Sequence, residues 1–277
     1  MEKLVDRFGR SIDTLRISIT DRCNFNCLYC GSRDFKFSKR GEILSYEEII
    51  KIVKIFLKLG IEKIRITGGE PFLRKNIIFL LNEISKLPQL CDFSITTNGF
   101  FLDDFIQEFK KTNCKRINIS LDTLKRERFK FITGIDGFEK VIRGIEKGIK
   151  ECLKIKINVV VLRNINDDEI LEFLKFGDFY NLTVRFIELM PTEKELNWKK
   201  YFVPEEEILG KIKTFHKIKS ISKDKYGSPN TKYFKIKNYK GTYGVISPIS
   251  SPFCHLCNRI RLNVKGELIL CLNSVKI

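Results

Sequence analysis

Residues 45–69, SYEEIIKIVKIFLKLGIEKIRITGG, contain the pattern of a helix followed by the pattern of a strand. Apolar residues at positions 49, 50, 53, 56 and 57 recur at helical spacing. Ser45 and Glu48 form a capping box at the start, and Gly60 ends the helix. The alternating segment 63–67 is typical of a strand, and Gly68 and Gly69 form a turn after it. The stretch predicts one unit of an α/β fold.

The same unit recurs on both sides of this segment. Strands are predicted near 15–19, 63–67, 92–97, 116–121, 156–162 and 183–188, and further helices near 76–86, 102–111, 138–150 and 167–176. Strands separated by helices need crossover connections and form a parallel sheet. Six units predict an α/β fold, an incomplete (β/α)6 parallel barrel, with its chemistry at the C-terminal ends of the strands.

The pattern changes after about residue 205. Strand-like pieces at 233–236, 241–246 and 267–270 predict a small C-terminal extension. We therefore expect two parts, a partial barrel over residues 1–205 and a C-terminal region over residues 206–277.

The composition indicates a globular protein, with 43% hydrophobic residues among 277 and no apolar run long enough for a membrane helix. The charged N-terminus lacks the pattern of a signal peptide, so a cytoplasmic location without membrane contact is expected. A net charge of +17 would suit nucleic acid, but the chain has no alanine and is rich in Ile, Lys, Phe and Asn. We interpret the charge as compositional bias and solvated faces, compatible with an acidic small-molecule substrate and with no nucleic-acid partner.

Nine cysteines without an export signal argue against a disulfide scaffold. Three of them, Cys91, Cys114 and Cys152, stand alone and are interpreted as small buried apolar residues. The other six fall into two sets of three.

The first set is Cys23-Asn-Phe-Asn-Cys27-Leu-Tyr-Cys30, in a loop after the first strand. Structural zinc usually needs four protein ligands, and the only histidines of the chain are His216 and His255. Three thiolates fit a 4Fe–4S cluster that leaves one iron open for chemistry.

This C-x3-C-x2-C motif, with Tyr29 before its last cysteine, resembles the radical S-adenosylmethionine (SAM) superfamily. Thr67-Gly-Gly-Glu-Pro71 at the end of the second predicted strand strengthens the resemblance. Glycines let a backbone approach a ligand closely, and Glu70 offers a carboxylate to a cation. The resemblance implies that SAM chelates the open iron and is cleaved to a 5′-deoxyadenosyl radical.

The second set, Cys254, Cys257 and Cys271, has the spacing C-x2-C-x13-C. A zinc site completed by His255 is the alternative, but a residue inside a C-x2-C loop rarely turns back onto the same metal, so a second open cluster is favoured. Arg259 and Arg261 share one face of the extended segment that follows, and two rigid guanidiniums suit a phosphate or a carboxylate.

Nearly the whole chain resembles the GTP 3′,8-cyclase family of molybdenum cofactor biosynthesis. The matching segments are 6–10, 15–25, 64–71, 96–99, 116–122, 156–160, 185–188 and 254–261. The resemblance implies that the 3′ hydrogen of GTP is abstracted and that the carbon radical attacks C8 of guanine, the first step of molybdopterin biosynthesis. It also implies two 4Fe–4S clusters, with the open iron of the second holding the purine.

The resemblance carries site residues to matching positions. Cys23, Cys27 and Cys30 would bind the SAM cluster, and Cys254, Cys257 and Cys271 the auxiliary cluster. SAM contacts fall on Tyr29, Gly69, Glu70, Ser120 and Met190. GTP contacts fall on Arg16, Arg65, Thr96, Lys156, Arg259 and Arg261, of which the last two are the catalytic candidates. Lys63 and Arg185 are further candidates for the triphosphate.

The residues themselves support part of this assignment. Arg16, Arg65, Lys156 and Arg185 lie on four of the six predicted strands and could converge on the barrel interior. Unpaired charges inside a barrel are costly, so an anionic ligand would explain them.

Two alternatives stay open from the sequence. One is another radical SAM enzyme with an auxiliary cluster that modifies a peptide or RNA. The other is a zinc-stapled nucleic-acid-binding protein, which leaves the Gly-Gly-Glu motif unexplained.

The family usually runs past its third C-terminal cysteine to a Gly-Gly end, whereas this sequence stops at Ile277, so complete turnover is left open. An electron donor and a next enzyme of the pathway are expected partners, and the oligomeric state, with a homodimer as one option, is undecided.

Overall fold

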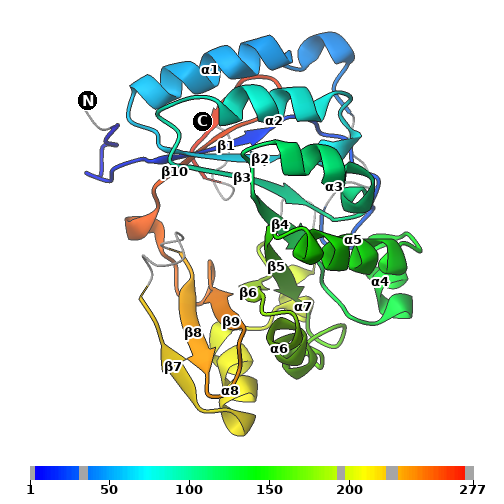
Figure 1. Cartoon of the computed structure of the whole chain (residues 1–277). Coiled ribbons are helices and arrows are strands. Elements are labelled where there is room, and N and C mark those ends of the chain that lie inside the picture. Colours follow the sequence, from blue (N-terminus) through cyan, green and yellow to red (C-terminus); the bar gives the residue numbers. More distant parts are fainter. Residues whose placement is uncertain (1–3, 31–36, 192–196, 223–229, 272–277) are drawn as a thin grey trace.

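The structure, a computed structural model, describes residues 4–30, 37–191, 197–222 and 230–271. Six parallel strands form its centre: β1 Thr14–Ser18, β2 Lys63–Thr67, β3 Asp92–Thr97, β4 Arg116–Ser120, β5 Lys154–Val161 and β6 Thr183–Glu188. The helices that connect them are α1 Tyr46–Lys58, α2 Ile77–Ser85, α3 Leu102–Lys111, α4 Arg126–Thr133, α5 Phe138–Lys150 and α6 Ile170–Phe179. Helices and strands alternate along this part of the chain and lie in two layers (Figure 1).

The C-terminal part extends the sheet at both ends. After α7 Trp198–Tyr201 and α8 Glu205–Phe215 come β7 Ile218–Ser220, β8 Lys232–Ile236, β9 Thr242–Ile246, β10 Arg259–Leu262 and β11 Leu268–Ile269. The strand order is β11-β10-β1-β2-β3-β4-β5-β6-β9-β8-β7. β10 therefore lies beside β1, and β9 lies beside β6, both in parallel pairing.

This order confirms the predicted α/β fold with an incomplete parallel barrel, because the sheet runs from β11 to β7 without closing. The boundary at residue 205 stays a prediction. Strands from both sides of it share one sheet, and Figure 1 shows β10 beside the first strands and the β8–β9 pair at the other end.

Side chains alternate between the two faces of each strand. In β2, Ile64 and Ile66 are fully buried in the main hydrophobic cluster, whereas Arg65 between them lines a cavity on the other face. The same periodicity of two places Ser94 and Thr96 of β3 and Lys156 of β5 on the cavity side. Burial of an isoleucine contributes roughly 1.5–3 kcal/mol, so the apolar set fixes this register strongly.

The predicted start of α1 is confirmed. Ser45 is the N-cap; its hydroxyl accepts a hydrogen bond from the Glu48 amide, and the Glu48 carboxylate accepts one from the Ser45 amide at 2.7 Å. Gly60 follows the helix with a positive φ of 90°. Helices α4 and α8 were not predicted, and α6 begins three residues later than expected near 167. Helix α4 has only eight residues and a mostly charged first turn, so its stability depends on tertiary packing of Phe129 and Ile132.

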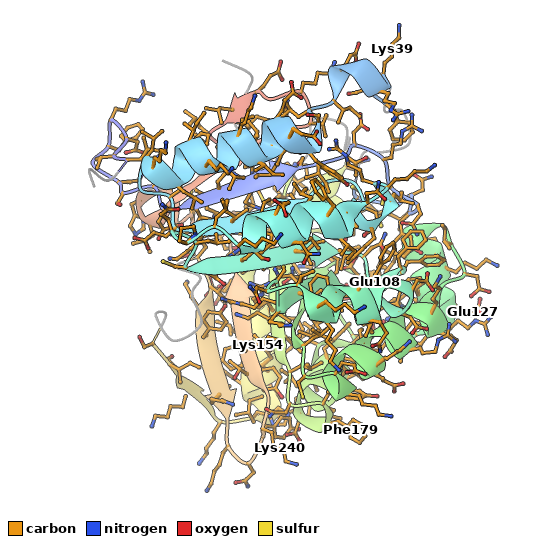
Figure 2. The ribbon with its side chains drawn as sticks, turned by 45° about the horizontal axis from the view of Figure 1, so that its top comes forward. Lys39, Glu108, Glu127, Lys154, Phe179 and Lys240 are labelled. Atoms are coloured by element: carbon orange, nitrogen blue, oxygen red, sulfur yellow. The ribbon has the colours of Figure 1, made fainter. Side chains whose placement is uncertain are left out.

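Charged side chains cover the outside of the molecule. Figure 2 shows Lys39, Glu127 and Lys240 at the edge of the molecule, and these three residues are exposed, as are Glu108 and Lys154. Across the described ranges, no helix is long and apolar enough to cross a membrane.

Candidate active site

A cavity of about 280 Å³ lies on the face of the sheet that the helices do not cover. Five of the six residues predicted to contact GTP line it, namely Arg16, Arg65, Thr96, Lys156 and Arg259. Arg185, a further candidate, lines it as well. The predicted convergence of strand-borne cations on the interior is therefore confirmed.

A row of arginines crosses the sheet at one level. Register pairing aligns Arg261 with Arg16, Arg16 with Arg65, Arg65 with Ser94, and Ser94 with Arg116. Neighbouring strands lie about 4.8 Å apart, so these guanidiniums add their fields over a short distance. Lys156 and Arg185 extend the positive region along β5 and β6.

The cations repel one another in the absence of an anion. Burial, followed by the charges of Arg259, Arg261, Arg185 and Arg65, lowers the pKa of Arg16 to about 9. Burial is also the main cause that lowers the pKa of Lys156 to about 7, followed by Arg185 and Arg116. Such groups gain most from an anionic ligand, which would restore favourable charge pairing.

One carboxylate pairs with two of these cations. Asp92 binds Arg65 and, at 2.7 Å, Arg116. Burial raises the pKa of Asp92, but the two guanidiniums outweigh burial and leave it below its usual value. Arg16 makes no ion pair with any residue of the described segments.

Several buried polar atoms of the lining lack a hydrogen-bond partner among the residues that the structure describes. They are Ser94 Oγ, Asn158 Oδ1 and Arg185 Nε. Because an unsatisfied buried polar atom costs about 1–3 kcal/mol, a polar ligand in the cavity would stabilise this lining.

The sequence interpretation missed part of the lining. Arg116, Asn118, Asn158 and Asp122 face the cavity, but none was assigned a role. The signal was present, because Arg116 and Asn118 share the strand parity of the assigned residue Ser120. Lys63, in contrast, is not part of this lining; its Nζ binds Asp13 at 2.8 Å.

The Gly-Gly-Glu turn holds the first cysteine loop in place. The Gly69 amide donates to the Thr20 carbonyl and the Glu70 amide to the Arg22 carbonyl, both at 2.7 Å. A Cβ on Gly69 would lie 2.2 Å from the Arg22 carbonyl oxygen, and one on Gly68 would lie 2.6 Å from that of Thr20. The two glycines are therefore needed for close contact between two backbones, whether or not a ligand is bound.

The first three cysteines lie near one another. Burial is the main cause that raises the pKa values of Cys23 and Cys27, and the charge of Cys30 raises both further. Cys23 Sγ also accepts weak hydrogen bonds from the Phe25 amide at 3.4 Å and from the Asn98 side chain at 3.7 Å. Three mutually close thiols with amide donors fit the thiolate ligands of an iron–sulfur cluster.

Glu70 is fully buried, and its carboxylate already has three donors. It accepts hydrogen bonds from the Phe72 amide, the Thr97 hydroxyl and the Asn98 amide at 2.8–3.1 Å. Burial raises its pKa to about 7, although these hydrogen bonds favour the charged form. Glu70 thus joins the turn after β2 to the end of β3, and a direct contact with SAM stays a prediction.

Tyr29 connects the cysteine loop to the cavity. Its hydroxyl donates to Asp122 at 2.5 Å, and the second oxygen of Asp122 accepts from the Val160 amide at 2.8 Å. Burial raises the pKa of Asp122 to about 6 and that of Tyr29 well above its usual value. Ser120 lines the cavity at the end of β4, whereas Met190, half-buried two residues after β6, is outside this lining.

The second cysteine set lies at the other side of the cavity. Cys254 is in the short 3-10 helix Cys254–Leu256, and Arg10 donates to its carbonyl at 2.5 Å. Cys257 contacts Arg259, and both Cys257 and Cys271 lie close enough to Arg261 to raise its pKa against the dominant effect of burial. Asn258 and Arg259 line the cavity, so its lining runs from this set to the Asp122 contact with Tyr29.

The remaining cysteines and the two histidines are further candidates as ligands of a single metal ion or as disulfide partners. Within the described segments, no three His, Cys, Asp or Glu side chains are grouped to hold one metal ion, and His255 lines a separate pocket. No disulfide joins any of the nine cysteines, all of which are described. Cys114 is buried as predicted, but the prediction was wrong for Cys91 and Cys152, which are exposed. Cys91 precedes β3, and Cys152 occupies a left-handed turn with a φ of 59° after α5.

Comparison with known proteins agrees with this geometry. The Radical SAM superfamily model matches residues 17–177, and the Molybdenum Cofactor Synthesis C model matches residues 182–276. GTP 3′,8-cyclase of Clostridium botulinum (strain Langeland) is 43% identical over 276 residues, which cover 99% of this chain and 85% of that protein. The chain belongs to the GTP 3′,8-cyclase family. The Clostridium perfringens (strain SM101) member is 42% identical over 97% of this chain and 83% of its own length.

Two solved structures share the fold of this chain. Streptococcus suis SuiB bound to S-adenosylmethionine aligns with a TM-score of 0.71 at 15% identity, over 96% of this chain and 63% of SuiB. The anSMEcpe structure with bound AdoMet and a peptide aligns with a TM-score of 0.55 at 22% identity, over 73% of this chain and 58% of that chain. Membership of the radical SAM superfamily implies a 4Fe–4S cluster and SAM as cofactors.

Proposed function

We propose that this chain converts GTP to 3′,8-cyclo-7,8-dihydro-GTP, the first step of molybdopterin biosynthesis. The observation that carries the proposal is a cavity with six cationic side chains that lies between two sets of three cysteines. Those side chains are Arg16, Arg65, Arg116, Lys156, Arg185 and Arg259. A triphosphate supplies the negative charge that such a cavity lacks.

We assign the first cysteine set to the SAM cluster and the second set to an auxiliary 4Fe–4S cluster. When bound, the first cluster and SAM supply the oxidant that removes the C3′ hydrogen of the ribose. The C3′ atom then bonds to C8 of guanine, and one electron and one proton from a reductant complete the dihydropurine. The product is therefore an isomer of GTP.

The protein residues bind and orient the substrate. The arginine row and Lys156 hold the phosphates. Arg261, at one end of this row, and Arg259 lie next to the second cysteine set. Tyr29 and Asp122 connect the first cysteine loop to the same cavity. This arrangement would hold the ribose between the SAM side and the guanine side, which is what an intramolecular bond formation requires.

The experiment that tests the proposal is anaerobic turnover. The protein is reconstituted with iron and sulfide, then given reductant and SAM, and 5′-deoxyadenosine is measured with and without GTP. GTP-dependent release, with a cyclised product of the mass of GTP, is expected. Release that depends instead on a peptide or an RNA would overturn the cyclase assignment and leave a different radical SAM activity.

Arg116 is expected to contribute to the phosphate site although the sequence did not single it out. Arg116→Gln should weaken GTP binding about 10-fold or more, because a hydrogen bond to a charged group is worth about 1.5–3 kcal/mol. Guanosine binding should change little, since Arg116 lies at the far end of the row from Arg261. Isothermal titration with both ligands measures the difference, with Lys115→Gln as the control because Lys115 is exposed. An equal loss for guanosine would contradict a phosphate role.

GTP binding should take up a proton at pH 8. The pKa of Lys156 is about 7 in the free protein, so its amine is mostly neutral at pH 8 and must be protonated to pair with phosphate. The affinity for GTP should consequently fall as the pH rises above about 7. Titrations at pH 8 in two buffers of different ionisation enthalpy should give different apparent enthalpies, and Lys156→Met should remove this difference. Identical enthalpies for the unaltered protein would contradict the prediction.

Lys156 also makes the free energy of unfolding depend on pH. Its pKa is lower in the folded chain than in the unfolded chain, so the unfolded chain holds more protons between about pH 7 and its ordinary value of 10.5. The contribution of Lys156 to the free energy of unfolding therefore rises with pH across this window.

A further inference from the structure

Glu188, the last residue of β6, is a buried carboxylate with three backbone donors. It is 1% exposed, and it accepts hydrogen bonds from the amides of Glu205 at 2.7 Å, Ile249 at 3.0 Å and Ser250 at 2.9 Å. Bonds of this charge-assisted kind are about twice as strong as neutral ones. Removing the acceptor would leave three amides without a partner, at a cost of about 1–3 kcal/mol for each one that stays buried.

The three donors belong to two distant segments. Glu205 is the first residue of α8, while Ile249 and Ser250 follow β9 and precede Cys254 by five and four residues. One side chain therefore joins the end of β6 to the segment that leads into the second cysteine set. On its own strand, Glu188 is three residues from Arg185 and two residues before Met190, a predicted SAM contact.

A second contact holds the same segment from the other side. Lys232 Nζ lies 2.8 Å from both carboxylate oxygens of Glu205 and donates to Ser251 Oγ at 3.1 Å. Glu188, Glu205 and Lys232 thus form a chain of polar contacts around residues 249–251. We call this set of three residues the β6 joint.

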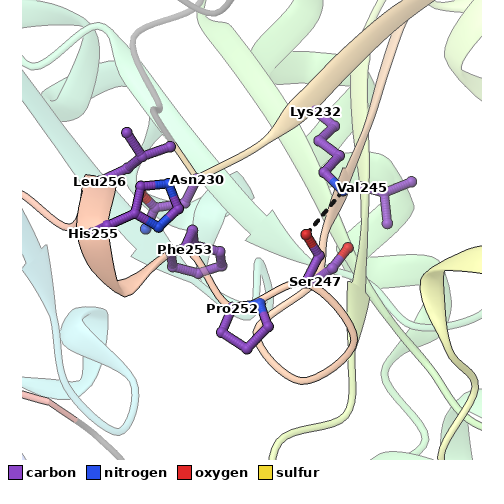
Figure 3. A pocket seen from close by; sticks show the side chains of 9 residues that line it. Asn230, Lys232, Val245, Ser247, Pro252, Phe253, His255 and Leu256 are labelled. Atoms are coloured by element: carbon purple, nitrogen blue, oxygen red, sulfur yellow. Dashed lines mark hydrogen bonds between the residues drawn. The ribbon is translucent and has the colours of Figure 1, made fainter.

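A pocket borders the loop that the β6 joint holds. A pocket of about 200 Å³ lies against it, lined in part by Ser247, Pro252, Phe253, His255 and Leu256 (Figure 3). Ser247 Oγ is buried there without a hydrogen-bond partner among the described residues. Because a loop beside a pocket is packed on fewer sides, its hydrogen bonds contribute more to holding its position.

The position of this loop affects the cavity. The Phe253 ring lies 5.9 Å from the Arg259 guanidinium carbon, and the Asn230 side chain contacts the same guanidinium. A shift of residues 249–253 would therefore move Phe253 and Cys254 together, and with them the support of Arg259. A displacement of about 1 Å in such a site can cost about 100-fold in rate.

We infer that Glu188 is a positioning residue that sets the location of the second cysteine set and of Arg259 relative to the cavity. The inference rests on the proposed function in one respect, namely that the second set carries a cluster that holds the guanine. It assigns Glu188 no contact with substrate. Its role is to connect the strand that carries Arg185 to the loop that carries Cys254.

The test uses Glu188→Gln in the reconstituted full chain. The amide keeps the size of the side chain but directs an NH₂ group at backbone amides that need an acceptor. Hydrogen exchange of residues 247–257 should become at least 10-fold faster, and the hyperfine coupling from ¹⁵N-labelled GTP at the auxiliary cluster should disappear. Cyclised product should fall at least 10-fold, whereas 5′-deoxyadenosine release should fall less than 3-fold, so that SAM cleavage becomes uncoupled.

Glu169→Gln is the matched control. Glu169 is also fully buried. It accepts hydrogen bonds from the Thr123 hydroxyl and the Leu124 amide and pairs with Arg128, and none of these partners belongs to a cysteine loop. Its replacement should cost stability without altering exchange at 247–257 or the ratio of product to 5′-deoxyadenosine. The same effect in both variants would overturn the inference.

Lys232→Met provides a second test at a more exposed position, because the Lys232 side chain is 53% exposed. It removes the contact with Ser251 and should change exchange and coupling in the same direction by a smaller factor. Unchanged exchange in both Lys232→Met and Glu188→Gln would refute the positioning role. If the unaltered protein shows no GTP-dependent product, the proposed function fails, while the exchange measurement still decides whether Glu188 holds the loop.

Discussion

Gly69→Ala is expected to abolish SAM cleavage and to remove the iron bound by the first cysteine set. The new Cβ would lie 2.2 Å from the Arg22 carbonyl oxygen and 2.8 Å from that of Asp21, and both atoms belong to the backbone. Side chains can rotate away from such a contact, but here the backbone of the loop before Cys23 must move. The two 2.7 Å hydrogen bonds from Gly69 and Glu70 to this loop would break with it.

Overpacking usually costs about 1–3 kcal/mol, and a contact with backbone should reach the upper end or exceed it. Iron per chain after reconstitution should fall by about half if the second set loads independently. Gly210→Ala is the control, because Gly210 is exposed in α8 and a Cβ at this position would have no neighbouring atom within 4 Å. That change should leave iron unaltered and stabilise the fold by about 0.5–1 kcal/mol. Normal iron content in Gly69→Ala would show that the loop tolerates displacement.

Arg16→Gln is expected to have opposite effects on stability and on binding. Arg16 is repelled by four other arginines and has no ion pair in the described segments, so the ligand-free protein should become more stable by about 1 kcal/mol or more. That gain corresponds to a rise in Tm of roughly 2–4 °C. GTP binding should weaken about 10- to 100-fold, because the same charge would contact phosphate.

Thermal unfolding without ligand and titration with GTP measure the two effects on the same variant. Arg126→Gln is a suitable control, since Arg126 is exposed and pairs with Asp136 at 3.0 Å. It should lower stability slightly, by about 0–1 kcal/mol, and leave GTP binding unchanged. A destabilised Arg16→Gln protein would contradict the view that the row is strained without an anion. Retained GTP affinity would contradict its role in binding.

Opposite effects of Arg16→Gln on stability and on GTP binding are what we expect of a site that binds an anion. Residues in the free cavity carry a cost that an anionic ligand would offset, and the pKa values of Arg16 and Lys156 below their usual range are two signs of that cost. Because the cations repel one another, the strands that carry them must be held together by other contacts. Asp92 and Glu70 each tie neighbouring strands or strand ends together beside it.

Local patterns in the sequence predicted most of the central fold. Apolar periodicity located the six parallel strands, and the capping box located the start of α1. Helices α4 and α8 were not predicted, because short or polar segments become helical through tertiary contacts rather than through their own propensity. The exposure of Cys91 and Cys152 was not predicted, because the burial of a residue depends on where the folded chain makes its turns.

The sequence by itself determined the alternation of strands and helices, the two cysteine sets and which strand residues share a face. These features depend on spacing along the chain, which is visible without a structure. Only the tertiary structure decided that Arg116 aligns with Arg65 through Ser94, and that Gly69 is packed against Arg22. It also decided that Glu188 reaches residues 249 and 250, some 60 positions away. The reason is physical: strand register and contacts between distant segments arise from packing of the whole sheet, which no local pattern contains.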